Sequence, residues 1–127
     1  MSLTTTRGIS IQVRSEFLPE RSSPRDGSYV FQYHVRISNL SDETTQLISR
    51  EWIVTNAEGE VQRHAGDGVV GEQPVLPPGG SFEYTSYSQL KTAVGAMQGH
   101  YQMVTSSGER FDAAIAPFTL AVPNALH

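Results

Sequence analysis

The residues with the clearest chemical signature are three glycines in the stretch HAGDGVVGEQPVLPPGG, residues 64–80. Gly66, Gly68 and Gly71 spell G-x-G-x-x-G, the pattern with which many proteins hold the pyrophosphate of a dinucleotide. The pattern acts when a strand precedes the glycines and a helix opens directly after them, because the helix N-terminus binds the phosphate. Here the next segment contains three prolines, which are incompatible with a helix interior. The sequence therefore argues against a dinucleotide-binding fold.

A simpler anion site remains open in the same loop. Glycine-rich turns can form nests of backbone N–H groups that bind anions without a helix. Such a site would use the backbone of Gly66, Gly68 and Gly71, with His64 beside it and Arg50 brought near by the fold. Its ligand would be a pyrophosphate, a nucleotide or another small molecule that contains phosphate.

The alternative interpretation is that the glycines only allow the chain to turn. Glycine adopts positive φ without strain, and Val69, Val70, Val75 and Leu76 could pack the loop onto the body of the protein. Two acidic residues inside the loop would also repel a phosphate. However, the loop is about sixteen residues long, and loops of that length in compact domains are often functional. Both interpretations stay open at this point.

The other chemically capable residues form no recognisable site. His34, His64, His100 and His127 are far apart in the chain and form no pair at metal-ligand spacing, so we expect no metal site. The G-x-S-x-G nucleophile elbow is absent, and there is no cysteine to act as a nucleophile or a zinc ligand. The sequence predicts a protein that is not an enzyme and has no cofactor.

Composition narrows the classes of partner. The net charge is −4, from nine basic and thirteen acidic residues, whereas nucleic-acid-binding domains usually carry an excess of Lys and Arg. No stretch approaches the ~20 apolar residues of a membrane span, and the first residues do not resemble a signal peptide. We therefore expect no nucleic-acid or membrane partner and a cytoplasmic location.

The dominant hydrophobic period is two, which is typical of strands. In SYVFQYHVRISN, large apolar residues alternate with polar ones, so one face is buried and the other is solvated. About seven such segments, separated by turns and almost without helix, predict an all-β antiparallel sandwich. The segments span residues 9–14, 28–39, 45–56, 60–65, 81–87, 99–106 and 111–122.

Four features of these segments lead to specific expectations. The segment 45–56 is apolar on both faces, with Leu47 and Ile53 on one face and Trp52 on the other, so we expect a central strand with Trp52 in the core. The last segment changes phase at Pro117, which predicts an edge strand that could pair with a second copy in a homodimer. Tyr87 has the opposite parity to its apolar neighbours, so it is a candidate exposed contact for a protein partner. The short run 89–93 is the only candidate helical turn.

Several stretches together resemble the ApaG family. They are LISREWIVTNAEGEVQ, GDGVVGEQPVLPPGGSFEYTS, GAMQGHYQMV and GERFDAAIAPFTL, and the likeness extends from about Arg7 to Leu120. The most specific parts are GVVGEQPVL and FEYTS. The resemblance implies an immunoglobulin-like, fibronectin type III-like sandwich. We expect one domain over residues 1–127, with flexible termini at residues 1–6 and 123–127.

The resemblance also implies a functional context. Bacterial members of the family are encoded near a dinucleoside tetraphosphatase and an RNA dimethyladenosine methyltransferase, and they are linked by phenotype to cobalt resistance and magnesium transport. In eukaryotes a similar domain is joined to an F-box protein and to a polymerase-interacting protein. These associations favour a module that binds an as yet unidentified protein partner. The alternatives are a binder of phosphate-containing small molecules at the glycine loop and, third, a hydrolase acting on nucleotides.

Overall fold

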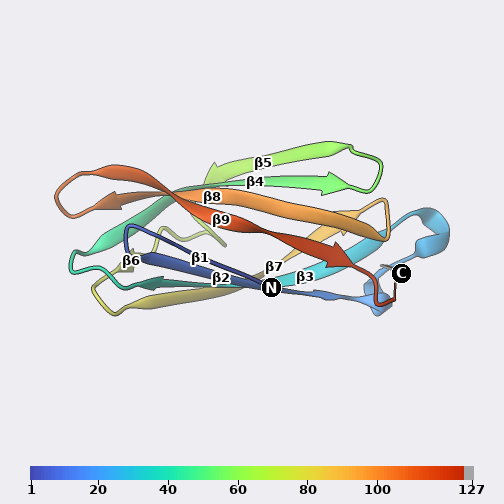
Figure 1. Cartoon of the computed structure of the whole chain (residues 1–127), viewed down its shortest axis with the longest axis horizontal. Helices are drawn as coiled ribbons and strands as arrows, with labels where there is room; N and C mark the ends of the chain where they lie inside the picture. Colours follow the sequence, from blue (N-terminus) through green and yellow to red (C-terminus); the bar gives the residue numbers. More distant parts are fainter. Residues whose placement is uncertain (125–127) are drawn as a thin grey trace.

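The protein is a sandwich of two antiparallel β-sheets in a computed structural model, of which residues 1–124 are described (Figure 1). One sheet has the strand order β1-β2-β3-β7, and the other has the order β5-β4-β8-β9, with the short β6 also paired to β4. The strands are β1 (Ser2–Thr6), β2 (Ile9–Phe17), β3 (Tyr29–Asn39), β4 (Thr45–Asn56), β5 (Val61–Asp67), β6 (Val75–Leu76), β7 (Ser81–Leu90), β8 (Val94–Thr105) and β9 (Arg110–Ala121). The predicted immunoglobulin-like all-β sandwich is confirmed.

Two of the nine strands were not expected from the sequence, and they are β1 and β6. Residues 1–6 were expected to be flexible, whereas the structure places Ser2–Thr6 in a strand that pairs with β2 over its full length. The turn between β1 and β2 consists of Arg7 at φ 48° and Gly8 at φ 83°. Two successive residues with positive φ are typical of the tight hairpin turn whose twist matches that of the strands. For the other end of the chain, residues 125–127 of the predicted flexible segment lie outside the described residues.

The core is formed by the alternate residues of both sheets that face each other. Trp52 is buried, as predicted, and β4 is central because β5 and β8 flank it. The predicted faces of β4 are wrong in part, because the pairing with β8 shifts register between Leu47 and Ser49. This β-bulge brings Leu47 onto the same buried face as Trp52 and Val54.

The last strand behaves as its sequence predicts. β9 forms the edge of its sheet, and it has a bulge where Ala116 and Pro117 lie opposite the single residue Gln98 of β8. The bulge allows Ile115 and Phe118, which differ in parity, both to enter the core. This edge is partly occupied, because the Thr6 hydroxyl accepts from the Ala114 N–H and the Ser15 hydroxyl donates to the Thr119 carbonyl. The homodimer through β9 stays a prediction that these contacts do not favour.

The connections are short and contain little helix. The predicted helical turn at residues 89–93 is wrong, because Gln89 and Leu90 complete β7 and the next three residues form a bend. Two single 3₁₀ turns, Pro19–Arg21 and Pro24–Asp26, lie instead in the proline-containing loop between β2 and β3. Within residues 1–124, no helix is long and apolar enough to cross a membrane.

Candidate functional site

A cleft of about 540 Å³ opens between the two sheets on the side where β5 and β7 form their edges. Its walls come from five strands, since β4, β5 and Met97 of β8 line one side and β3 and β7 line the other. The lining residues include Arg50, Trp52 and Val54 of β4, Gln62 and His64 of β5, Tyr33 of β3, and the run Ser86–Leu90 of β7. Two residues expected at an anion site, Arg50 and His64, are therefore brought together in this cleft.

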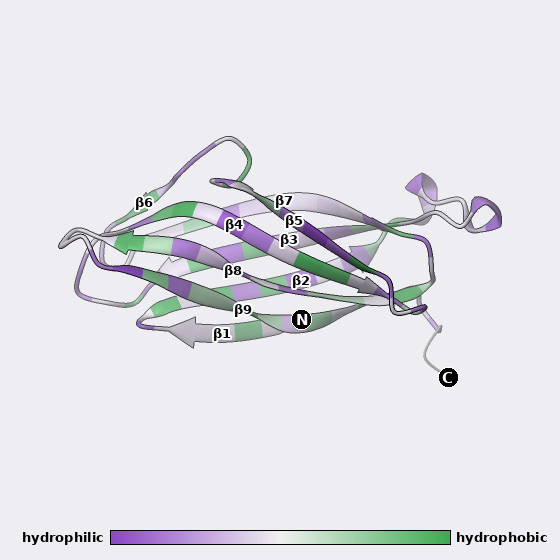
Figure 2. Ribbon diagram, turned by 90° about the horizontal axis from the view of Figure 1, so that it is seen from above, coloured by the Kyte–Doolittle hydropathy of each residue, from purple (hydrophilic) through white to green (hydrophobic). Residues whose placement is uncertain are grey.

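The cleft exists because β5 extends the sheet beyond the apolar core. On the inner face, Arg50 pairs with Gly66, Trp52 with His64, and Val54 with Gln62 across the β4–β5 ladder. The β5 members of these pairs are polar or lack a side chain, and β5 is hydrophilic along its length (Figure 2). Since the inner face of β5 has no apolar side chain to bury, it overhangs the opening instead of closing against β7.

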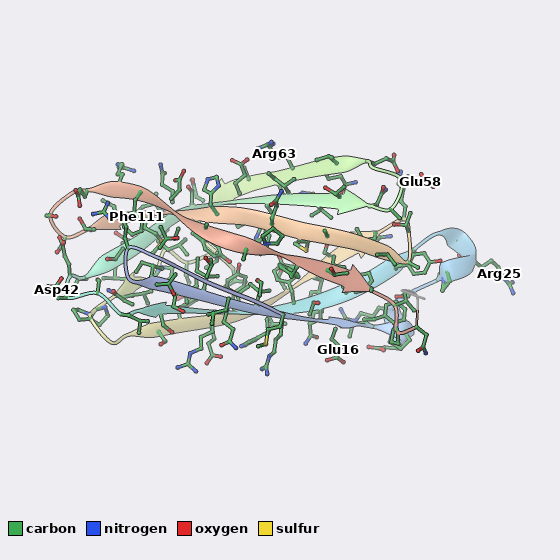
Figure 3. The ribbon with its side chains drawn as sticks, in the orientation of Figure 1. Glu16, Arg25, Asp42, Glu58, Arg63 and Phe111 are labelled. Carbon is green, nitrogen blue, oxygen red and sulfur yellow. The ribbon has the colours of Figure 1, made fainter. Side chains whose placement is uncertain are left out.

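The outer face of the same ladder carries an ion pair. Arg63 of β5 points away from the body of the protein and binds the carboxylate of Glu51 on β4 (Figure 3). This arrangement leaves Glu51 outside the cleft. It also follows from the strand period of two, because Glu51 lies between the inward-facing Arg50 and Trp52.

The glycines of the loop position Arg50. Its Nη1 donates to the carbonyl oxygens of Asp67 and Gly68, at 3.0 and 2.8 Å. A Cβ on Gly66 would lie 3.0 Å from the Arg50 guanidinium, so the glycine provides the space in which the guanidinium lies. A Cβ on Gly68 would lie 2.2 Å from the Glu72 carbonyl oxygen, so the turn cannot close around a larger residue.

Much of the loop backbone is turned toward the protein. The N–H of Gly68 donates to the Ile48 carbonyl, and Val69 and Glu72 exchange two hydrogen bonds across the turn. Three N–H groups that an anion-binding nest would need are therefore already bonded within the chain. Gly68 and Gly71 have positive φ, whereas Gly66 continues β5. These contacts favour a turning role for Gly68 and Gly71, and they leave the side chains of Arg50 and His64 as the groups that could meet an anion.

The apolar residues of the loop divide between core and surface. Val69 and Leu76 are buried, as a loop packed onto the sandwich requires. Val70 and Val75 are each 57% exposed, so they do not pack in the way the turning interpretation expected. The loop is thus anchored at two points and leaves an exposed apolar pair between them.

Aromatic residues form the floor of the cleft. The Trp52 ring lies 5.2 Å from that of Tyr33 and 6.3 Å from that of Tyr101, centroid to centroid. The Tyr84 and Tyr101 hydroxyls bond to each other, and burial raises the pKa of both phenols. The Trp52 indole N–H is buried and has no hydrogen-bond partner among the described residues. Of these aromatic residues, Tyr33 and Trp52 line the cleft itself.

The charge of the cleft is opposite to that of the whole chain. Its lining includes Arg50, His64 and Lys91, and the residues that line it include no Asp or Glu. Ser86 and Ser88 add hydroxyl groups from β7. A smaller adjoining hollow contains Glu60, whose carboxylate accepts from the Asn56 side-chain amide. In a chain of net charge −4, a cleft lined in this way favours an anionic group.

Tyr87 lies beside the cleft and not within it. Its side chain is 49% exposed, as predicted, and the Arg21 guanidinium stacks 4.9 Å from the ring centroid. Because β7 alternates, Tyr87 projects from the outer face while Ser86 and Ser88 project inward. Tyr87 is therefore one of the residues at the cleft, but its ring lies on the outer face of the sheet.

The three histidines among the described residues lie at separate places, His64 in the cleft and His34 and His100 elsewhere, while His127 lies outside the described residues. His34 contacts Glu83 and Thr85 at 2.8 and 3.0 Å on the outer face of its sheet, and His100 lies 3.9 Å from Asp112. Within the part of the chain that the structure describes, no three His, Asp or Glu residues are grouped to hold a metal ion. The hydrogen bond from His34 lowers the pKa of Glu83.

Sequence reasoning missed most of this cleft. It located Arg50 and His64, but it assigned their ligand to the glycine backbone and took Tyr33 and Trp52 as core alone. The inward serines of β7 and the polar inner face of β5 were the available signal. Both are positions where strand parity calls for an apolar residue and the sequence has a polar one.

Comparisons with known proteins identify the group to which this architecture belongs. The family model for the ApaG domain matches residues 19–105. Protein ApaG of Anaeromyxobacter dehalogenans is 53% identical over 127 residues, which is 100% of both chains, and Protein ApaG of Ralstonia nicotianae is 50% identical over 94% of this chain and 96% of its own length. The crystal structure of a Bordetella pertussis protein named ApaA superposes with a TM-score of 0.89 at 46% identity, covering 91% of this chain and 94% of that one. The matched segment includes every strand that lines the cleft, and the chain belongs to the ApaG family.

Proposed function

We propose that the chain is a non-enzymatic binding module that acts through a protein partner, and that the partner binds in the cleft beside β5 and β7. The observation that carries this proposal is the chemistry of the cleft, which places Arg50, Trp52 and Tyr33 in one opening. Arg, Trp and Tyr are the residue types that contribute most binding energy at protein interfaces. The volume also suits the insertion of one or a few side chains of a partner.

The contacts of the carboxylates support a role without catalysis. Glu51 and Glu83, which an acid–base pair would need close together, lie on different sheets. Each is held by a basic residue, since Glu51 binds Arg63 and Glu83 binds His34. The relatives are named Protein ApaG, and that name carries no reaction.

Tyr87 is a second contact in this proposal. Its exposed ring lies on the outer face of β7, the strand that also supplies Ser86 and Ser88 to the cleft. Exposed tyrosines commonly become buried at interfaces because the ring is large and loses little conformational entropy. Tyr87→Ala is expected to weaken the partner complex, and an unchanged affinity would count against this part of the proposal.

The physiological setting that we propose is the cytoplasm, with an indirect effect on cobalt resistance and magnesium transport. The effect would be indirect because the described residues include no grouping suited to a metal ion. The partner, rather than this chain, would then handle the cation. A bacterial strain lacking the gene should regain its cobalt tolerance with the native chain and not with an Arg50→Met variant that is shown to fold.

The decisive experiment places a photoreactive residue in the cleft of the full chain in cells. Gln62 is exposed and lines the cleft, whereas Arg36 is exposed on the outer face of the opposite sheet. A discrete covalent adduct with one protein is expected from position 62 and not from position 36. No adduct at position 62, or the same adducts from both positions, would contradict the proposal.

A second candidate ligand is a small molecule that contains phosphate, and the basic lining of the cleft favours it. Arg50, His64 and Lys91 would contact the phosphate oxygens. The check is an amide-resolved NMR titration with pyrophosphate and with a dinucleoside tetraphosphate. Saturable amide shifts in both residues 64–68 and residues 86–91 would indicate that the phosphate binds in the cleft. Shifts confined to residues 64–72 would indicate that it binds at the glycine loop instead.

A further inference from the structure

We infer that the segment bound in the cleft is an extended, acidic stretch of the partner protein that adds as a strand to the free edge of β7. One of its carboxylates would then lie against Arg50 and His64. This inference rests on the proposed function and names the chemistry of the partner. It follows from three independent features, which are the open edge of β7, the absence of protection on that edge, and the charge of the cleft.

In β3, alternate residues form backbone hydrogen bonds to opposite neighbours. This alternation, the hydrogen-bond phase, shows which backbone N–H and C=O groups of β7 have no partner strand. On one side of β3, the Leu40 N–H donates to the Gly8 carbonyl, and the Val30 carbonyl accepts from the Leu18 N–H, so even-numbered residues bond toward β2. On the other side, the Asn39 N–H donates to the Gly80 carbonyl, so odd-numbered residues of β3 bond toward β7.

The register of the β3–β7 ladder shows which residues of β7 form the hydrogen bonds to β3. Tyr33 is opposite Ser86 and Val35 is opposite Tyr84, so the even-numbered residues of β7 bond to β3. The odd-numbered residues, which include Thr85, Tyr87 and Gln89, then direct their N–H and C=O groups away from the sheet. β7 pairs with no other strand among the described residues. Tyr87 and Gln89 are among the residues that line the cleft, so this open edge borders it.

The edge of β7 lacks the devices that usually prevent strand addition. Protected edges are short, contain Lys or Pro, or carry a bulge. β7 has ten residues without Lys or Pro, its register with β3 has no shift, and its one charged residue, Glu83, is paired with His34 on the outer face of the sheet. The other edges differ, because β1 has five residues, β9 contains Pro117 with a bulge, and β5 carries Arg63, His64 and Asp67. β7 is thus the long unprotected edge of the described chain.

The cleft selects the charge of the added strand. Every second side chain of such a strand would point inward, toward the cleft. The basic groups there are unbalanced, since no Asp or Glu lines it. The hydrogen bonds of Arg50 to the described residues use Nη1 only, which leaves Nη2 and Nε to bind a carboxylate. A carboxylate, which accepts two parallel hydrogen bonds from a guanidinium, fits this arrangement.

The test is selection of a displayed library of random ten-residue peptides on the immobilised full chain. Enrichment of peptides containing Asp or Glu is expected, with affinity falling at least tenfold on Arg50→Met and on His64→Glu and unchanged on Arg36→Met. His64→Glu alters an exposed residue, so it tests the charge even if Arg50→Met perturbs the loop. No enrichment, or enrichment of neutral or basic peptides, would overturn the inference.

The mode of binding is tested on the best selected peptide. The largest amide shifts are expected in residues 81–90, and N-methylation of alternate peptide bonds should abolish binding in one phase and not in the other. Shifts that leave β7 unchanged would refute strand addition. If pyrophosphate competes for the cleft while no peptide binds, the occupant is a small anion and the inference fails.

The two levels of proposal can fail separately. An adduct at position 62 with a protein that lacks an acidic extended segment would retain the proposed function and reject this inference. The absence of any adduct together with the absence of any selected peptide would reject both.

Discussion

At the residue scale, Gly68 is fixed by two separate constraints, and they predict a large cost of substitution. Its φ is +62°, where a Cβ meets the neighbouring carbonyl, and the added Cβ would lie 2.2 Å from the Glu72 carbonyl oxygen. Gly68→Ala should therefore lower the free energy of unfolding by more than about 2 kcal/mol.

Gly71 is the matched control for this substitution. It has a similar φ of +80°, but no atom lies within 4 Å of the place that an added Cβ would take, so only the backbone strain remains. Gly71→Ala should cost about 1 kcal/mol. Urea denaturation of both variants measures the difference, and equal costs would show that the turn relaxes around Gly68.

The buried phenols predict how stability depends on alkaline pH. Burial raises the pKa of Tyr33, Tyr84 and Tyr101 above the ordinary value of 10.0. A raised pKa means that the folded protein retains protons that the unfolded chain releases, so these groups contribute full stability below pH 10.0 and lose it as the pH rises toward their folded values. The free energy of unfolding should therefore decline above about pH 10.

The double variant Tyr84→Phe/Tyr101→Phe separates the loss of stability caused by these phenols from the loss caused by other groups that titrate at alkaline pH. It removes both hydroxyls of the buried pair, so it leaves neither one without its partner. Its stability should fall less steeply than that of the native chain between pH 9 and pH 11, roughly the range that brackets an ordinary phenol. If the free energy of unfolding falls equally steeply with pH in the variant and in the native chain, the loss of stability at alkaline pH comes from other groups.

At the element scale, β7 offers a test of its hydrogen-bond phase by proline substitution. Proline lacks an N–H, so it is tolerated where the N–H faces away from the sheet and disruptive where the N–H bonds a neighbour. Ser86→Pro removes a bond to β3 and should destabilise the fold by about 3 kcal/mol, whereas Tyr87→Pro should cost less by at least about 1 kcal/mol. Equal losses, measured by thermal and urea unfolding, would invalidate the assigned phase.

The strand β1 leads to a second prediction at this scale. It pairs with β2, and Thr6 accepts a hydrogen bond from Ala114 of the opposite sheet. Removal of residues 1–6 should lower the melting temperature and expose the edge of β2, which increases self-association. Differential scanning calorimetry and light scattering check both effects. A truncated chain with native stability would mean that β1 contributes no net free energy.

The presence of the strands was predictable from the sequence. How the strands pair and which of them face each other across the sandwich was not. The alternation in residues 28–39 indicated a half-buried strand, and the phase change at Pro117 indicated the bulge of β9. The bulge at Ile48 was not visible, because an apolar residue fits both parities and only pairing with β8 decides between them. For the same reason, Arg50 and His64 could be named as candidates, while the wall that faces them required the position of β7 across the sandwich.

At the scale of the whole molecule, a negative chain presents a basic cleft, and this has consequences for binding kinetics. The net charge of −4 repels an acidic peptide at distances beyond a few ångströms, whereas Arg50, His64 and Lys91 attract it after entry. Salt screens the distant repulsion strongly, because the Debye length is about 10 Å at 0.1 M, and it screens the contact inside the cleft less. The two effects act on different rate constants.

The association rate of a selected acidic peptide should therefore stay constant or rise when salt increases from about 50 to 500 mM, because screening removes the long-range repulsion. The dissociation rate should rise over the same range, because the carboxylate–guanidinium contact weakens. Trp52 is the single tryptophan and lies in the cleft, so its fluorescence reports binding directly in stopped-flow experiments. A neutral Gln-for-Glu peptide serves as the control and should show no change in association rate. An association rate that falls steeply with salt would instead indicate steering by an extended basic surface, and the charge would then act outside the cleft.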